Sequence, residues 1–225
     1  AINAGIAPKF SDPYSYGQGT NWQDEVFNNN APMMNHQVSV SGASEKVNYL
    51  FSLGFYTQDG IVGGNFDRSN YERLTLRSNT QYTLFDESKE RNWLNSLKVT
   101  SNLSYARIKS TNFDDNSTWG TPLGSALALS PILNVYDETE EAIKAQFDKY
   151  GTTAEYTPVY DPRNGKLFSI PGEFGEMSNP IAKLSLPGDK HWSHKFVANF
   201  SAELQLWDNL KFKTSYGADL SFWGY

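Results

Sequence analysis

The stretch HKFVANFSAELQLW, residues 194–207, places an apolar side chain at nearly every second position. A period of two is that of a β-strand, whose successive side chains point to opposite faces. One face carries Phe196, Ala198, Phe200, Ala202, Leu204 and Leu206. The other carries Lys195, Asn199, Ser201, Glu203 and Gln205, with Val197 as its apolar exception. The stretch therefore predicts a long strand with one dry and one wet face.

Five further stretches alternate in the same way and predict five more strands. They are residues 35–44, 47–57, 71–85, 93–108 and 210–222. The links between successive strands are short, long, short, very long and short. Such a meander, with short turns at one end and long loops at the other, is typical of an outer-membrane β-barrel. In the first short turn, SGASEK, we expect Gly42 to supply a positive φ.

The composition excludes several classes of protein. The chain has 225 residues, no Cys and a net charge of −6, with 15% aromatic residues and a mean hydropathy of −0.55. An acidic chain without a basic stripe argues against nucleic-acid binding. The absence of Cys excludes disulfide scaffolds, thiol catalysis and Cys-zinc sites. The chain does not begin with Met, so we expect a processed or truncated product.

The dry faces can be covered by lipid or by a protein core, and three features favour lipid. The last two predicted strands exceed the ~9–11 residues that a tilted strand needs to cross a bilayer. Their charged residues all fall on the wet face. The dry faces mix Ala, Thr and Ser with Leu and Phe, and aromatic residues lie near strand ends, as in interfacial girdles. These aromatics are Tyr82, Phe85, Trp93, Tyr105, Trp207, Phe222 and Trp223.

Six strands cannot close a bacterial outer-membrane barrel, for which eight is the observed minimum. We therefore predict an all-β fold in which about six strands form part of a large antiparallel transmembrane β-barrel, with long extracellular loops and a short loop helix. The predicted organisation is a loop segment over residues 1–32, four strands over 33–108, a long extracellular loop region over 109–193 and two strands over 194–225.

The long region 109–193 contains one good helix candidate and one weaker one. In residues 137–151, Asp137 and Glu140 have the spacing of a capping box and Gly151 supplies a stop. The apolar stretch 120–133 predicts a turn or two of helix ending before Pro131.

Residues 21–62 resemble the SusC/RagA-like family of TonB-dependent outer-membrane transporters. The resemblance rests on three elements: Trp22, Asp24 and Phe27; then Ser39, Val40, Ser41, Gly42, Ser44, Glu45 and Lys46; then Tyr49, Ser52, Leu53, Gly54, Gln58, Asp59, Gly60 and Ile61. LSPILNVYD and SNPIAKL look like later landmarks of the family.

The resemblance implies a 22-stranded barrel with an N-terminal plug in the outer membrane of a Gram-negative bacterium, surrounded by lipid. Such a transporter imports an oligosaccharide or a peptide captured by a SusD-like surface lipoprotein, with energy from the TonB complex acting through the plug. No plug or TonB-contacting segment is recognisable in this chain, and most strands of such a barrel are missing.

The chain shows no catalytic motif, so we predict no enzyme and no cofactor. We also predict no metal site, because a spacing of three puts His191 and His194 on opposite faces of a strand. Carboxylates and amides can hydrogen-bond sugar hydroxyls while an aromatic ring stacks on a sugar. Candidate substrate contacts in the long loop are therefore Asp114, Asp115, Asn116 and Trp119. A solvated loop tip explains the same residues.

A secreted carbohydrate-binding β-sandwich is the main alternative. In it, the dry faces would pack against a second sheet and the aromatics would line a sugar-binding face. A barrel enzyme and a porin without energy coupling are weaker alternatives. A second sheet packed across Phe200, Leu204, Phe212 and Leu220 would decide for the sandwich.

Overall fold

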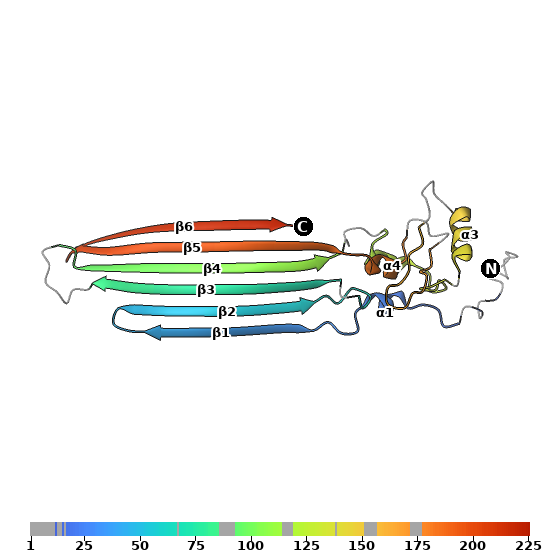
Figure 1. Ribbon diagram of the computed structural model, residues 1–225, viewed down its shortest axis with the longest axis horizontal. Coiled ribbons are helices and arrows are strands. Elements are labelled where there is room, and N and C mark those ends of the chain that lie inside the picture. The colour runs from blue at the N-terminus through green and yellow to red at the C-terminus, as the bar shows by residue number, and fades with distance from the viewer. Residues whose placement is uncertain are drawn as a thin grey trace, which may run out of the picture. The chain divides into compact units, whose positions relative to one another are not determined.

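Six antiparallel strands form one sheet in the computed structural model, in the order of the chain (Figure 1). They are β1 (Met33–Ala43), β2 (Val47–Asp59), β3 (Asn70–Phe85), β4 (Ser96–Asn112), β5 (Asp189–Trp207) and β6 (Leu210–Gly224). The structure describes Asp12, Ser15 and residues 17–66, 68–85, 93–113, 119–137, 139–150, 157–171 and 177–225. The antiparallel order places the β1–β2, β3–β4 and β5–β6 links at one end of the sheet and the β2–β3 and β4–β5 links at the other. The β2–β3 link, residues 60–69, is as long as the β3–β4 link, residues 86–95, so the large difference in length rests on the β4–β5 link.

The strands are longer than the 5–6 residues common in soluble proteins. β5 has 19 residues and β4 has 17. β4 continues to Asn112 and β5 begins at Asp189, so each extends into the range 109–193 that the sequence assigned to a loop. This extension puts Tyr105 in the middle of β4, which corrects the prediction that it lies near a strand end.

The turn between β1 and β2 is closed by Ser44 rather than by glycine. The Ser44 backbone N–H donates to the Val47 carbonyl at 2.7 Å, and the Val47 N–H donates to the Ser44 hydroxyl at 3.1 Å. Gly42 lies within β1 opposite Tyr49, and it is not among the residues with a positive φ. A Cβ on Gly42 would lie 2.5 Å from the Tyr49 hydroxyl. The predicted role of Gly42 is therefore wrong, because an aromatic ring rather than a turn requires the glycine there.

Two irregularities adjust the predicted faces. The register shifts between Thr83 and Phe85, so that Phe85 pairs with Leu97, and again between Gln205 and Trp207. Leu84 and Leu206 fall inside these shifts. Bulges of this kind are common where strands approach a turn.

The described parts of residues 1–29, 62–68 and 113–187 form a second compact unit, called the loop unit here. It contains α1 (Trp22–Val26), α2 (Pro122–Ala128), α3 (Glu140–Tyr150) and α4 (Pro180–Ser185). Its core is apolar and buried, and α1, α2 and α4 pack together in it. The core consists of Trp22, Val26, Val62, Ala126, Leu129, Val135, Phe168, Ile181 and Leu184. Within the described residues, no helix has the length and apolar character needed to cross a membrane.

The helices α2 and α3 confirm the two helix candidates, but α1 and α4 were not predicted. All three short helices begin with a side-chain cap: Asn21, Thr121 and Asn179 each accept a hydrogen bond from a backbone N–H of the first turn. α3 begins at Glu140, two residues later than a capping box with Asp137 as N-cap would place it.

Candidate functional site

The register of the sheet assembles one continuous apolar face. Residues that pair across antiparallel strands share a face. One central row is Val38, Leu53, Leu76, Tyr105, Phe196 and Leu220, and the next is Val40, Phe51, Ser78, Leu103, Ala198 and Ala218. From the row of Phe196 to the row of Leu204, the face carries no Asp, Glu, Lys or Arg.

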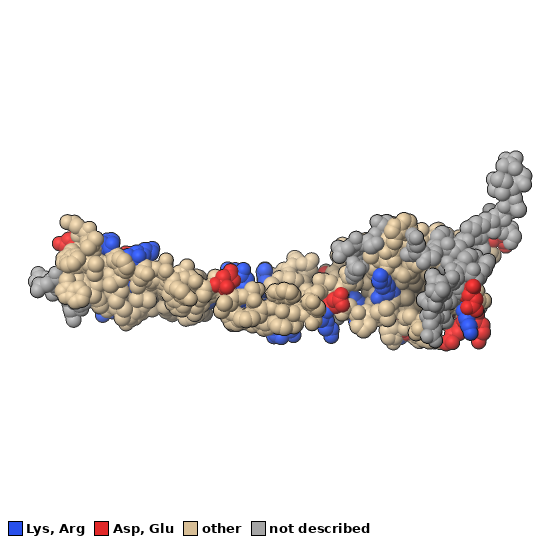
Figure 2. Space-filling view, turned by 90° about the horizontal axis from the view of Figure 1, so that it is seen from above, with Lys and Arg blue, Asp and Glu red and all other residues tan. Residues whose placement is uncertain are grey.

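This face approaches the height of the apolar band of outer-membrane barrels. Its charge-free rows span eight residue steps on β4, from Leu97 to Tyr105, which is about 26 Å along the strand. At the tilt of about 40° found in barrels, this corresponds to roughly 20 Å, against about 25 Å for the apolar band of such barrels. In the view of Figure 2, uncharged side chains make up most of the visible surface of the described residues.

The described residues contain no second sheet across the apolar face. Phe200 is 44% exposed, and Phe212 and Leu220 are each 53% exposed. Such a large exposed apolar surface is not stable in water. The sandwich alternative lacks the sheet that it requires.

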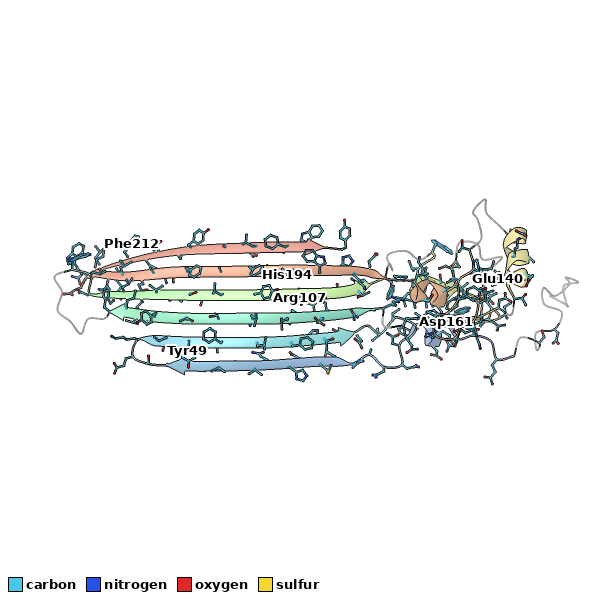
Figure 3. The ribbon with its side chains drawn as sticks, viewed as in Figure 1. Tyr49, Arg107, Glu140, Asp161, His194 and Phe212 are labelled. Carbon is cyan, nitrogen blue, oxygen red and sulfur yellow. The ribbon has the colours of Figure 1, made fainter. Side chains whose placement is uncertain are left out.

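Polar groups appear on this face one row beyond the apolar band, at the end of the sheet with the long β4–β5 link. Arg107 pairs with His194 across β4 and β5 (Figure 3). The Tyr105 hydroxyl lies 2.8 Å from Nδ1 of His194. His191 lies on the opposite face of β5, as the spacing predicts. The two histidines therefore cannot act as a metal pair.

The other face of the sheet is polar and carries nine charged residues of the strands, whereas the first face carries charges only beyond its apolar band, at Asp59, Glu72, Arg107, Lys109 and Lys190. The basic residues of the polar face are Arg73, Arg77, Lys98, Lys195, Lys211 and Lys213, and its acidic residues are Asp189, Glu203 and Asp219. Lys195 and Asp219 form an exposed ion pair at 3.3 Å. This face is thus net basic although the whole chain carries −6.

A hollow lies on the polar face between β1, β2 and β3, and its lining includes Arg73 and Arg77. Reasoning from the sequence alone did not identify this feature. The two arginines lie four positions apart on β3 and so share a face, but only the register places Gly54 of β2 between them.

In the loop unit, a buried carboxylate joins two segments of the chain. Asp161 is fully buried and accepts hydrogen bonds from the Tyr136 hydroxyl at 2.7 Å and from Nη2 of Arg163 at 2.7 Å. Nη1 of Arg163 donates to the Gly64 carbonyl at 2.8 Å, and the guanidinium lies 3.7 Å from the centre of the Phe66 ring. Arg163 thereby ties residues 62–68 to residues 157–171.

The environment of Asp161 keeps it ionised. Burial alone would raise its pKa, but hydrogen bonds from Arg163 and Tyr136 outweigh burial and lower the pKa to about 2. Burial, together with the bond to Asp161, raises the pKa of Tyr136. These groups are fully engaged with one another, so this cluster holds the loop unit together rather than offering a reactive group.

Of the predicted substrate contacts, Trp119 is described and is 57% exposed. Asp114, Asp115 and Asn116 lie outside the described residues. The structure therefore neither assembles nor separates the four residues, and their role stays a prediction.

The chain is similar to sections of much longer curated proteins. It is 29% identical over 190 residues to "TonB-dependent receptor SusC" of Bacteroides thetaiotaomicron, covering 82% of this chain and 16% of the relative. It is 30% identical over 200 residues to "TonB-dependent receptor P26" of Formosa agariphila, covering 89% of this chain and 16% of the relative. The chain thus spans about a sixth of the length of these relatives. No family model matches it.

The fold is similar to that of solved RagAB structures. The RagAB peptide importer in its "open-open" state gives a TM-score of 0.57 at 22% identity, over 91% of this chain and 19% of that chain. A further structure of the RagAB peptide transporter gives 0.56 at 21% identity, over 90% and 19%. These findings confirm the predicted resemblance to SusC/RagA-like TonB-dependent receptors and the fold class, a six-stranded section of a large antiparallel barrel.

Proposed function

We propose, from the premise that this chain resembles a section of SusC- and RagA-like TonB-dependent receptors, that it forms part of an outer-membrane nutrient importer. The apolar face contacts lipid, and the polar face lines the water-filled interior of the barrel. The imported solute is an oligosaccharide or a peptide, and the role of the protein is transport rather than catalysis.

One observation carries this proposal: a charge-free apolar face roughly 20 Å high on strands of 11–19 residues. A Lys or Arg at mid-bilayer costs roughly 2–4 kcal/mol, which explains why the charges of the strands lie on the other face or beyond the apolar band. The names of the relatives support the same reading, since each is called a TonB-dependent receptor.

The loop unit is proposed to be extracellular. Barrels of this kind have short periplasmic turns and longer extracellular loops, and most of the loop unit belongs to the long β4–β5 link. In this proposal, residues 1–32 and the long region around 109–193 face the cell exterior. Asp114, Asp115, Asn116 and Trp119 remain candidate contacts for the solute.

A SusD-like surface lipoprotein is the proposed partner of the loop unit, and the TonB complex would act through a plug outside this chain. Exposed apolar side chains support a protein contact there, because they are characteristic of protein interfaces. They include Trp119, Leu127 and Leu186.

The proposal is tested with the full-length parent protein in its native host. We expect it to fractionate with the outer membrane, to require detergent for extraction and to lose solute uptake when TonB is deleted. A parent that is released by a salt wash and stays monodisperse in plain buffer contradicts the proposal.

The partner is tested separately by co-purification of the SusD-like lipoprotein with the full-length parent. We expect Leu127→Asp to reduce the recovered lipoprotein severalfold. The matched control is Lys144→Asp on α3, which changes an exposed residue outside the apolar patch. Equal recovery with both variants contradicts a contact at Leu127.

A further inference from the structure

The hollow on the polar face has a volume of about 110 Å³ and is lined by β1, β2 and β3. Asn35 and Gln37 contribute from β1, Tyr56 from β2, and Arg73 and Arg77 from β3. The register places all five side chains on the polar face. The strands therefore bring together two guanidinium groups, two amides and a phenol around one depression.

The hollow exists because Gly54 has no side chain. Gly54 pairs with Gln37 on one side and Thr75 on the other. A Cβ built on Gly54 would meet only the Thr75 Cβ, at 3.9 Å. The backbone does not require glycine here, since Gly54 is not among the residues with a positive φ. The missing side chain instead leaves space between Arg73 and Arg77.

The two arginines carry uncompensated charge. They are the only charged residues on the polar face of β1, β2 and β3. Asp219 shares a row with Arg77, but three strand spacings, about 14 Å, separate them, and Asp219 is paired with Lys195. That distance exceeds the screening length of about 8 Å in physiological salt. The hollow is therefore electropositive within an acidic chain.

The guanidinium groups are held but not neutralised. The Arg73 guanidinium lies 5.6 Å from the centre of the Tyr56 ring, and the Tyr56 hydroxyl donates to Gln58 at 2.6 Å. The ring thus supports Arg73 without using its N–H donors. Among the described residues, Arg77 has no hydrogen-bond or ion-pair acceptor. Both forks remain available for a planar anion.

We infer that this hollow binds a carboxylate carried by the imported solute, such as a uronate of an oligosaccharide or an acidic side chain of a peptide. Guanidinium forks match a carboxylate bidentately, and Gln37 and Asn35 can add neutral hydrogen bonds. The inference rests on the proposed function, because a solute reaches this face only if the face lines the interior of the barrel. It goes beyond the proposed function because it states that the solute is negatively charged and names the site that binds it.

The test measures binding to the full-length parent in detergent by titration calorimetry. The probes are trigalacturonate and the N-acetylated, C-amidated tripeptide Ala-Glu-Ala, each compared with an uncharged counterpart, the methyl-esterified trimer and the N-acetylated, C-amidated tripeptide Ala-Gln-Ala. The variants are Arg77→Gln, Arg73→Gln and Gly54→Leu, the last of which fills the hollow. The controls are Lys213→Gln, a basic residue on the same face, and Gly217→Leu, where a Cβ meets only the Ala198 carbonyl at 3.8 Å.

We expect one charged probe to bind at least tenfold more tightly than its neutral counterpart, and the identity of that probe separates the sugar source from the peptide source. Charge-assisted hydrogen bonds of this kind support a loss of about tenfold for each arginine variant. Gly54→Leu should abolish the preference, and the two controls should change affinity less than twofold.

No preference for either charged probe, or an equal loss in Lys213→Gln and Arg77→Gln, overturns the inference. Such a result in a parent that resides in the outer membrane and needs TonB leaves the proposed function standing. A parent outside the outer membrane refutes both.

Discussion

The sheet and the loop unit use apolar residues in opposite ways. The loop unit buries its large side chains: Ile143 is fully buried, and Ile181 and Leu184 are each 1% exposed. The described strands bury scarcely any, and Val38, Phe51 and Phe212 are each more than half exposed. The difference indicates that the loop unit supplies its own dry interior, whereas the sheet depends on an apolar surrounding.

The charged groups differ in the same sense. The buried Asp161 accepts several hydrogen bonds, two of them from Tyr136 and Arg163, whereas Lys195 and Asp219 form an exposed pair. Tertiary packing therefore stabilises the loop unit, while hydrocarbon on one face and water on the other stabilise the sheet.

The largest effect is expected from removing the buried carboxylate. Asp161→Ala leaves Arg163 and Tyr136 without their acceptor and should destabilise the loop unit by about 3 kcal/mol, since the half-exposed Arg163 can turn to water but the hydrogen bonds to the carboxylate are lost. Hydrogen exchange of the loop-unit amides in the full-length parent measures this. The matched change, Asp219→Ala in the exposed pair, should cost about 1 kcal/mol or less. Similar losses of stability in Asp161→Ala and Asp219→Ala would contradict the difference between the buried carboxylate and the exposed ion pair.

Truncation of leucine distinguishes the two kinds of apolar surface. Leu184→Ala creates a cavity in the loop-unit core and should cost about 3 kcal/mol. Leu220→Ala on the apolar face should cost about 1 kcal/mol or less, because lipid chains fill the vacated space and no cavity remains. Hydrogen exchange for Leu184→Ala, and urea titration of the parent in vesicles for Leu220→Ala, give the two values. A large cost at Leu220 would point to a packed protein layer there.

A charge placed on either face of β5 tests their assignment. Phe200 lies at the middle row of the apolar band, so Phe200→Lys should lower the stability in vesicles by roughly 2–3 kcal/mol. Asn199→Lys, one residue earlier on the polar face, should change it by less than about 0.5 kcal/mol. Urea titration compares the stabilities of the two variants directly. A larger loss for Asn199→Lys than for Phe200→Lys would mean that the polar face contacts lipid and the apolar face lines the lumen.

The smallest of these effects is expected from acid, which protonates Asp161 and thereby destabilises the loop unit. Because the pKa of Asp161 is lowered to about 2, its contribution is complete above the pKa of an unfolded aspartate, near 4. The contribution declines as the pH falls from about 4 to about 2 and amounts to roughly 2 kcal/mol. Hydrogen exchange at pH 5, 4, 3 and 2 should show this decline in the wild-type loop unit. The same dependence in Asp161→Ala would assign it to other groups.

The strands were predictable from sequence because a strand with one face in an apolar surrounding and one in water alternates apolar and polar residues with a period of two. Phe196, Phe200 and Leu204 needed only their spacing to be placed on one face. The strand ends were less predictable: β4 and β5 extend past the apolar band, where polar residues such as Ser110 and Lys190 continue the pairing.

The loop unit and the hollow depend on partners that are distant in sequence. Asp161 meets Tyr136 and Arg163 meets Gly64 only after folding. The position of Gly54 between Arg73 and Arg77, which leaves the hollow open, follows only from the register of the strands. The start of α4 could have been predicted from the sequence, because Asn179 is a preferred N-cap residue and Pro180 is a preferred residue at the first position of a helix.

Spin labels along β5 test the central claim, that hydrocarbon covers one face of the sheet, most directly. Single cysteines are placed at positions 195–205 of a parent lacking other cysteines, and the labelled proteins are reconstituted in vesicles. We expect oxygen, which partitions into lipid, to relax labels most strongly at 196, 198, 200, 202 and 204, and a water-soluble nickel chelate to relax those at the odd positions. A profile without this alternation, or with the chelate reaching 198, 200 and 202, would contradict the account.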